Sequence, residues 1–151
     1  VPYLVLDSGE ALREGPAIVQ YIADQAPEKH LAPPAGSMAR YQLQSWLNFI
    51  GTELHKGFSP LFTPGMPDEA KTLAKNRLLS RLTWLDGELD GKQYLMGDTF
   101  TVAAGYLFTV PNWPAMVGVD ISGLANLAAY RARVAARPGV QAAMKAEGLL
   151  K

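Results

Sequence analysis

The stretch from Tyr41 to Leu61 carries two separate helical patterns, and it constrains the fold more than any other part of the chain. Its apolar residues recur at steps of three and four, which predicts one buried stripe on a helix: Leu43, Leu47, Ile50, Leu54 and Phe58. Polar, mostly uncharged residues recur in the same way on another face: Gln44, Asn48, Thr52, His55 and Ser59. Such a face favours the wall of a partly buried cleft, because buried polar groups need partners. A half-buried helix with locally satisfied polar groups is the alternative interpretation.

The composition favours a packed globular chain and excludes several classes of function. The 151 residues are 48% hydrophobic and 19% charged, and they carry a net charge of +0. A balanced charge argues against nucleic acid or an anionic membrane as the main partner. The absence of Cys excludes disulfides, thiolate metal sites and a Cys nucleophile within these residues. The two His, His30 and His55, lie far apart and no HExxH pattern is present, so we expect no metal site. These features fit a cytoplasmic protein.

The first part of the chain predicts a hairpin followed by a helix. Residues 3–6 are typical of a strand, residues 7–9 of a turn, and residues 10–13 of a short return strand. Pro16 then suits the first turn of a helix that ends near residues 26–27. The chain opens on strand-like sequence without Met, and a strand needs a neighbour and a covering layer. We therefore expect an N-terminal portion to be missing.

The rest of the chain predicts a bundle of helices. A linker at residues 33–36 precedes Ser37, which is a plausible cap for the helix described above. Further helices are expected from residue 68, over residues 102–110, over residues 124–137 and from Pro138. Pro111 and Pro114 must kink or end the segment over residues 102–110. We expect two domains, residues 1–30 and residues 37–151, with an α+β fragment followed by an all-α helical bundle.

A first candidate site is the helix start at Glu14 and Gly15. A helix N-terminus has unpaired N–H groups and partial positive charge, so it attracts a carboxylate. Glu14 beside it could hold an ammonium group, and the pair would suit the zwitterionic end of an α-amino acid. An acidic residue that merely stabilises a helix start is the alternative reading.

Two further candidates are the strand entry at Val1 and Pro2 and the segment from Thr52 to Lys56. A cis bond before Pro2 would let Val1 present its backbone to a peptide, although the sequence alone favours the trans form. His55 could steady a thiolate or relay a proton near neutral pH, with Lys56 adding positive charge. A surface histidine that only stacks or caps is the alternative.

Four blocks of this sequence together resemble the glutathione S-transferases, and the bacterial beta class in particular. They are VPYLVLDSGEALREGPAIVQYIAD, SWLNFIGTELHKGFSPLF, GDTFTVAAGYLF and RPGVQAAMKAEGL. The resemblance implies the C-terminal part of a thioredoxin-like glutathione-binding domain (β-hairpin plus helix), then an all-α C-terminal domain, in a homodimer. It also implies an enzyme that conjugates the glutathione thiolate to a hydrophobic electrophile. A non-catalytic module that keeps the fold for binding or protein contacts is the alternative.

The resemblance also assigns roles to individual residues. Pro2 resembles the family's cis-proline, and Val1 the residue that pairs with the cysteinyl backbone of glutathione. Glu14 and Gly15 resemble the pair that holds the γ-glutamyl end, although many relatives have Ser in place of Gly15. The remaining implied site residues are Asn48, which reaches across the dimer, and Thr52, Glu53, Leu54 and His55, the last in a supporting catalytic role. The main thiol-activating residue is not in this chain, so the chain alone is expected to be inactive.

One position departs from the family pattern. The family places Thr-x-x-Asp at the start of its central helix, whereas Thr101 is followed here by Ala104. In such a capping box the Thr side chain and the acidic side chain each bond the other's backbone N–H. We expect Thr101 to keep the first of these bonds and the second to be lost.

Overall fold

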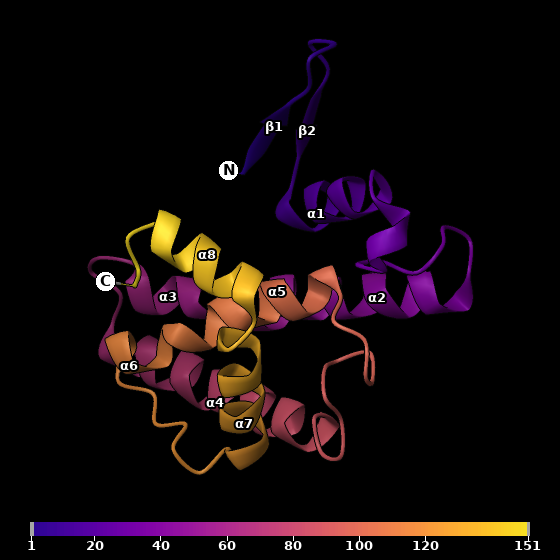
Figure 1. Ribbon diagram of the computed structural model, residues 1–151. Helices are drawn as coiled ribbons and strands as arrows, with labels where there is room; N and C mark the ends of the chain where they lie inside the picture. The colour runs from indigo at the N-terminus through magenta and orange to yellow at the C-terminus, as the bar shows by residue number, and fades with distance from the viewer. Residues whose placement is uncertain (1, 151) are drawn as a thin grey trace.

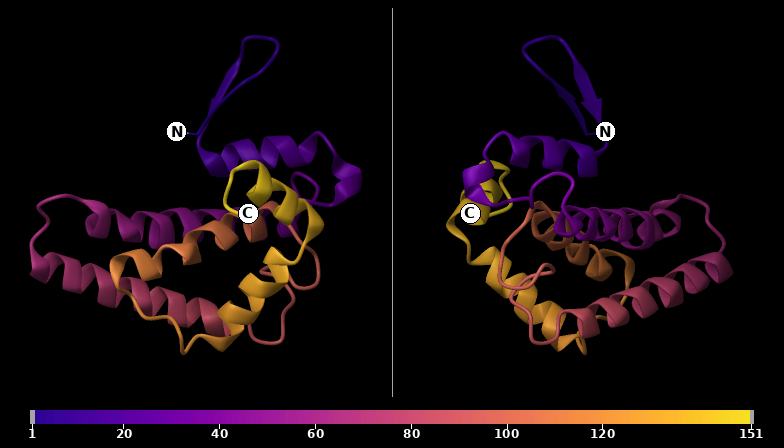
Figure 2. Two further views of the ribbon diagram at one scale, coloured as in Figure 1. Left: turned by 60° about the vertical axis from the view of Figure 1, so that its left-hand side comes forward. Right: turned by 90° about the vertical axis from the view of Figure 1, so that its right-hand side faces the viewer.

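The chain begins with a short antiparallel hairpin that stands away from the helices. The fold is seen in a computed structural model that describes residues 2–150. Strands β1 (Tyr3–Val5) and β2 (Ala11–Arg13) pair with Leu4 opposite Leu12. Gly9 closes the turn with a φ of 85°, a conformation that suits glycine. The hairpin projects from one end of the molecule, with α1 (Gly15–Asp24) at its base (Figures 1 and 2).

The predicted long helix is present, but it is not regular. Helix α2 (Met38–Phe49) runs into a π-helical segment, η2 (Ile50–His55), then a 3-10 turn, η3 (Lys56–Phe58), and α3 (Ser59–Phe62). Ser37 caps α2 as expected, with its Oγ accepting from the Arg40 N–H at 3.2 Å. Every residue of the predicted apolar stripe is buried. The π segment was not predicted from the sequence, since the apolar spacing is compatible with a regular helix.

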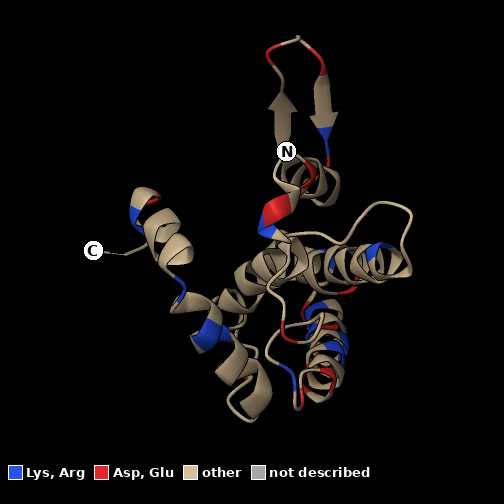
Figure 3. Ribbon diagram, turned by 45° about the vertical axis from the view of Figure 1, so that its right-hand side comes forward, with Lys and Arg blue, Asp and Glu red and all other residues tan. Residues whose placement is uncertain are grey.

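The other elements complete a helical bundle around α5. They are η1 (Pro27–Lys29), α4 (Asp68–Glu88), α5 (Val102–Thr109), η4 (Val110–Asn112), α6 (Pro114–Val117), α7 (Ala125–Ala135) and α8 (Pro138–Ala146). Helix α5 packs against α1, α2 and α7, and the Tyr130 hydroxyl of α7 donates to the Ala104 carbonyl at 2.7 Å. Pro111 and Pro114 end α5 as expected, because each begins or lies in a new short helix. Charged residues are densest on α4 (Figure 3).

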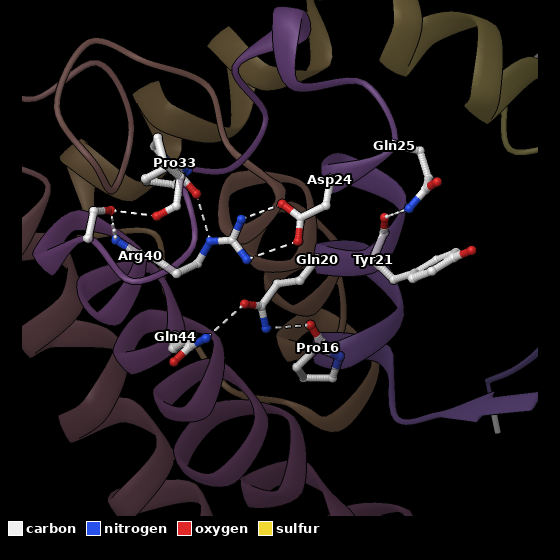
Figure 4. A network of polar contacts seen from close by, with 10 residues as sticks. Pro16, Gln20, Tyr21, Asp24, Gln25, Pro33, Arg40 and Gln44 are labelled. Carbon is white, nitrogen blue, oxygen red and sulfur yellow. Dashed lines mark hydrogen bonds and ion pairs between the residues drawn. The ribbon is translucent and has the colours of Figure 1, made fainter.

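A buried arginine joins the hairpin–helix unit to the bundle (Figure 4). Arg40 of α2 is only 5% exposed, and its guanidinium pairs with the Asp24 carboxylate of α1. Its Nε also donates to the Pro33 carbonyl at 2.7 Å. Beside it, Gln44 donates to Gln20 at 3.2 Å. These contacts bridge the two expected domains and fix α1 against α2. The two-stranded sheet plus helix, followed by helices alone, agrees with the coarse fold expectation.

The expected side-chain cap at Thr101 is wrong. The Thr101 side chain makes no cap hydrogen bond, and its buried Oγ1 has no partner among the described residues. The Ala104 N–H donates instead to the Thr101 backbone carbonyl at 2.9 Å. The Thr101 N–H also lacks a hydrogen-bond acceptor in residues 2–150, and Ala104 is fully buried. Both halves of the capping box are therefore missing, and two polar groups of Thr101 are left unpaired.

We expect Ala104→Asp to stabilise the full-length protein by about 0.5–2 kcal/mol, the usual scale of a cap. The new carboxylate could accept from both the Thr101 N–H and its hydroxyl, which offsets the cost of burying it. Denaturant melts measure the change, and a lower midpoint at unchanged slope would contradict the prediction.

Thr101→Val provides the matched control. In the natural sequence it removes only an unpaired hydroxyl, so we expect stability to change by less than about 0.5 kcal/mol. In the Ala104→Asp background the same substitution removes a new partner and should cost about 1 kcal/mol. Equal effects in both backgrounds would show that no capping bond had formed.

Candidate functional site

A cavity of about 850 Å³ lies between α1 and the α2–η2 helix. Its lining residues come from the hairpin–helix unit on one side and from α2, η2 and α5 on the other: Pro2, Glu14, Gly15, Pro16, Ala17, Gln20, Gln44, Leu47, Asn48, Gly51, Thr52, His55, Lys56 and Tyr106. Five of the expected binding-site residues are therefore brought together: Glu14, Gly15, Asn48, Thr52 and His55. The polar face of the long helix is a cleft wall, as its pattern favoured. We call this space the polar cavity.

Glu14 holds an unusual backbone conformation at the start of α1. Its φ of 70° lies in the left-handed region, where a residue with a side chain is strained. Glu14 is also the N-cap of α1, and its carbonyl accepts from the N–H groups of Ala17 and Ile18 at 3.0 Å. Strain of this kind persists where the surrounding structure enforces it, and it gathers at functional sites. The conformation places the Glu14 side chain and the first N–H groups of α1 at the edge of the same cavity.

Gly15 is the first residue of α1 and leaves open space beside Pro2. A Cβ at this position would lie 3.6 Å from Pro2 Cγ, which is an ordinary van der Waals contact. The cavity floor can therefore accept a small side chain at position 15 without backbone movement. Val1, the first of the expected binding residues, lies outside the described residues.

The opposite wall is formed by the last turn of α2 and the π segment. Thr52 Oγ1 donates to the Asn48 carbonyl at 3.0 Å, which links the two segments. The Asn48 side chain is exposed and makes no hydrogen bond within residues 2–150. π-helical turns recur at functional sites because the extra residue changes which side chains share a face. Here the turn keeps Asn48, Thr52 and His55 on one cavity wall.

His55 is held between two aromatic side chains. Its Nδ1 lies 2.9 Å from the Tyr106 hydroxyl of α5, and its ring packs edge-on to Trp113 with centroids 4.9 Å apart. Burial is the main reason that the pKa of His55 lies below its usual range, and the positive charge of Lys56 lowers it further. The imidazole is therefore neutral at pH 7, and it can donate from one ring nitrogen while accepting at the other.

A second hollow of about 460 Å³ adjoins His55. It is lined by His55, Phe58, Ser59, Phe62, Thr63, Pro64 and Trp113. Phe58, Phe62 and Trp113 contact one another with ring centroids 5.5–6.3 Å apart. We call this space the aromatic hollow. His55 is the one residue that lines both spaces, so a polar cavity and an aromatic hollow meet at a neutral imidazole.

Two expected site residues point elsewhere. Glu53 forms ion pairs with Arg77 at 3.2 Å and Arg81 at 2.9 Å, both on α4. The hydrogen bond from Arg77 is the main reason that the pKa of Glu53 lies below its ordinary value. Leu54 is fully buried in the core, so only its backbone could serve a site. Neither residue lines the polar cavity.

Sequence reasoning missed Tyr106 and Trp113, which hold His55. Tyr106 lies in the apolar run of residues 102–110, which reads as a core helix. The available signal was the one tyrosine in that run, because a buried tyrosine O–H usually finds a partner. Trp113 lies between Pro111 and Pro114 and gave no comparable signal.

Other kinds of site have no support in residues 2–150. No group of three or more His, Cys, Asp or Glu side chains is placed to hold a metal ion there. None of the described helices combines the length and apolar character needed to cross a membrane.

Comparison with known proteins identifies the family. Residues 49–138 match the family model described as the glutathione S-transferase C-terminal domain. The chain is 46% identical over 149 residues to the glutathione S-transferase GstA of Escherichia coli O157:H7, covering 99% of this chain and 74% of that protein.

Solved structures give the same result. A bacterial beta-class glutathione S-transferase of Sphingomonas chungbukensis superposes with a TM-score of 0.94 at 54% identity, covering 99% of this chain and 75% of that one. A sphingomonad glutathione S-transferase solved in complex with glutathione superposes with a TM-score of 0.93 at 51% identity, with the same coverage of 99% and 75%. The chain therefore belongs to the glutathione S-transferase family.

Proposed function

We propose that this protein binds glutathione in the polar cavity and joins its thiolate to a hydrophobic electrophile held in the aromatic hollow. The observation that carries the proposal is the position of His55, which lines both spaces. Conjugation brings a polar tripeptide and an apolar electrophile together at one point. The polar cavity suits the tripeptide, and the aromatic hollow suits the electrophile. The enzymatic relatives and the glutathione complex of a similar structure support the same conclusion.

The γ-glutamyl end of glutathione is expected at Glu14 and Gly15. That end carries an ammonium and a carboxylate on one carbon, so it matches an acidic side chain beside the N-terminus of α1. Gly15 has no hydroxyl, Pro16 has no N–H, and the N–H groups of Ala17 and Ile18 already bond the Glu14 carbonyl. The backbone N–H of Gly15 is therefore expected to supply the hydrogen bond to the carboxylate. We also propose that Val1 pairs with the cysteinyl backbone and that Thr52 completes the site in the polar cavity. Glu53 and Leu54 would support this wall from behind, Glu53 through its ion pairs to α4 and Leu54 through its buried side chain.

The reaction is a nucleophilic substitution or addition by the thiolate. The thiol proton leaves, a sulfur–carbon bond forms, and in a substitution the leaving group departs with the bonding electrons. A lowered thiol pKa raises the thiolate fraction at neutral pH. We propose that His55 supports this step through a hydrogen bond to developing negative charge. The main thiol-activating residue is expected to lie outside these 151 residues.

The oligomeric state and the cellular location follow from the same proposed function. We infer a homodimer in which Asn48 contributes to the neighbouring subunit's site. Tyr41 precedes Asn48 by seven residues and so shares its helix face, and it is 57% exposed. Nearby, Phe49 of α2 contacts Trp84 of α4 with centroids 4.8 Å apart, and Trp84 is also exposed. Exposed aromatic groups of this kind are typical of protein interfaces.

We also propose that residues 1–30 form the C-terminal part of a thioredoxin-like domain and that residues 37–151 form the all-α domain. The whole protein would be a cytoplasmic enzyme of detoxification.

Turnover by the full-length protein decides between an enzyme and a non-catalytic binding module. We expect conjugation of glutathione to a chromogenic aryl halide well above the uncatalysed rate. Binding of glutathione without such turnover against a panel of electrophiles would favour the binding module.

His55→Ala in the full-length protein is expected to lower kcat by about tenfold or more, because a hydrogen bond to developing charge is lost. The KM for glutathione should change by less than about threefold, since the γ-glutamyl end is held elsewhere. Steady-state kinetics separate the two constants. His30→Ala is the matched control, because His30 lies outside both spaces. An unchanged kcat with intact folding would remove His55 from the reaction.

Asn48→Ala is expected to weaken glutathione binding by about three- to tenfold, the loss of one hydrogen bond, while the dimer persists. Calorimetric titration measures the Kd, and sedimentation measures the oligomeric state. Asn76→Ala on the exposed face of α4 serves as the control. An unchanged Kd for Asn48→Ala would exclude this side chain from the site.

Gly15→Ser is expected to tighten glutathione binding by about three- to tenfold, because a hydroxyl joins the backbone N–H of position 15 at the γ-glutamyl carboxylate. The added Cβ meets only Pro2 at an ordinary contact distance. Gly15→Ala supplies the same Cβ without the hydroxyl, so its Kd should stay near that of the natural protein. Equal affinities for the Ser and Ala variants would show that the hydroxyl makes no bond to the ligand.

A further inference from the structure

We propose that Tyr106 is a positioning residue for the transfer reaction: its hydroxyl donates to Nδ1 of His55, so the neutral ring carries its proton on Nε2 where the polar cavity meets the aromatic hollow. The inference rests on the proposed function for its catalytic consequence, but the tautomer itself is a property of the protein alone.

The geometry ties His55 to α5, a helix in the middle of the bundle. Tyr106 projects from α5, the helix that packs against α1, α2 and α7, and it is partly buried against the core. Its hydroxyl lies 2.9 Å from His55 Nδ1, and the two rings meet edge-on with centroids 6.0 Å apart. Trp113 contacts the same imidazole with an interplanar angle of 73°. Two aromatic contacts and one hydrogen bond therefore restrict the ring, although it belongs to a largely exposed residue.

The backbone of the π segment leaves room for this hydroxyl. Gly51 faces Tyr106, and a Cβ at position 51 would lie 3.7 Å from the Tyr106 oxygen. The hydroxyl therefore sits against the η2 backbone beside His55, inside the wall of the polar cavity. Tyr106 itself lines that cavity, together with Glu14 from the far wall.

The direction of the hydrogen bond follows from the partners present. A phenol can donate or accept, and so can Nδ1. If Nδ1–H donated to Tyr106, the phenol proton would have no acceptor among residues 2–150. Donation from Tyr106 to Nδ1 satisfies both groups, and the ring proton then belongs on Nε2.

The surrounding charges favour a neutral His55 and a protonated Tyr106, as this hydrogen bond requires. Burial raises the pKa of Tyr106, and the nearby Glu14 carboxylate raises it further, so the phenol keeps its proton. Burial and the Lys56 ammonium lower the pKa of His55. Lys56, Glu14 and Tyr106 are the titratable groups that line the cavity with His55. A neutral His55 and a protonated Tyr106 are thus both stable near pH 7.

The consequence is a fixed donor at the point of reaction. With Nδ1 occupied, Nε2–H is the free polar group of a side chain that lines both spaces. A donor held in place before reaction stabilises negative charge on the sulfur or on the leaving group without reorganisation. The opposite tautomer would present a lone pair there and would repel the same charge.

Nitrogen-detected NMR of ¹⁵N-histidine-labelled full-length protein tests the tautomer directly. The His55 signals are assigned by their loss in His55→Ala. We expect the natural protein at pH 7 to show a protonated Nε2 and an unprotonated Nδ1 at His55. Tyr106→Phe should give a mixture of both tautomers, while Tyr94→Phe, whose hydroxyl accepts from Arg137 at 3.2 Å, should not. A protonated Nδ1 in the natural protein, or unchanged tautomers in Tyr106→Phe, would overturn the proposal.

A kinetic cycle tests the consequence for catalysis. Tyr106→Phe is expected to lower kcat by about three- to tenfold, the scale of one neutral hydrogen bond, with a smaller change in the KM for glutathione. In the His55→Ala background the same substitution should change kcat by less than about twofold, because Tyr106 acts through His55. An equal loss in both backgrounds would mean that Tyr106 acts independently, and the inference would fall. If the natural protein has no transferase activity, the proposed function fails. The NMR result still tests whether Tyr106 donates to Nδ1 of His55.

Discussion

Burial of one apolar stripe through an irregular helix is the constraint on which the rest of the structure depends. Leu43 and Leu47 of α2 and Ile50 and Leu54 of η2 are all buried at 0–1% exposure, although the helix changes from α to π between them. Burial of a side chain of this size contributes about 1.5–3 kcal/mol, so the stripe fixes the rotation of both segments. Once that rotation is fixed, Asn48, Thr52 and His55 are left on the wall that faces α1.

The second wall depends on a different interaction. Arg40 is buried between α1 and α2, and its pairing with Asp24 and the Pro33 carbonyl leaves few other positions for α1. A buried charge is tolerated only when it is paired, so this contact specifies the geometry. It holds the strained Glu14 and the N-terminus of α1 opposite His55. The polar cavity is therefore a product of two separate restraints, one apolar and one ionic.

Much of the fold and part of the candidate site could be predicted from the sequence. The stripe from Leu43 to Phe58 and the cap at Ser37 are local patterns with a fixed period, and both are confirmed. The convergence of Glu14 with His55 was expected through the family resemblance, because no local pattern brings residues so distant in sequence together. The π turn was missed since its spacing does not differ from that of an α-helix over a few residues. The predicted side-chain cap at Thr101 was wrong because the Ala104 N–H bonds the Thr101 backbone carbonyl instead. Tyr106 was interpreted as a core residue because its hydroxyl is the only feature that indicates a polar role.

The central claim is that two chemically different spaces meet at His55, and a crystal structure of the full-length protein with an S-alkylated glutathione tests it most directly. The account predicts that the γ-glutamyl end lies at Glu14 and Gly15, that the sulfur lies beside His55, and that the alkyl chain enters the hollow of Phe58, Phe62 and Trp113. A third hollow, beside Phe100 and Val102, shares Gly15 and Tyr106 with the polar cavity. An alkyl chain in that hollow, or a peptide bound outside the polar cavity, would contradict the account.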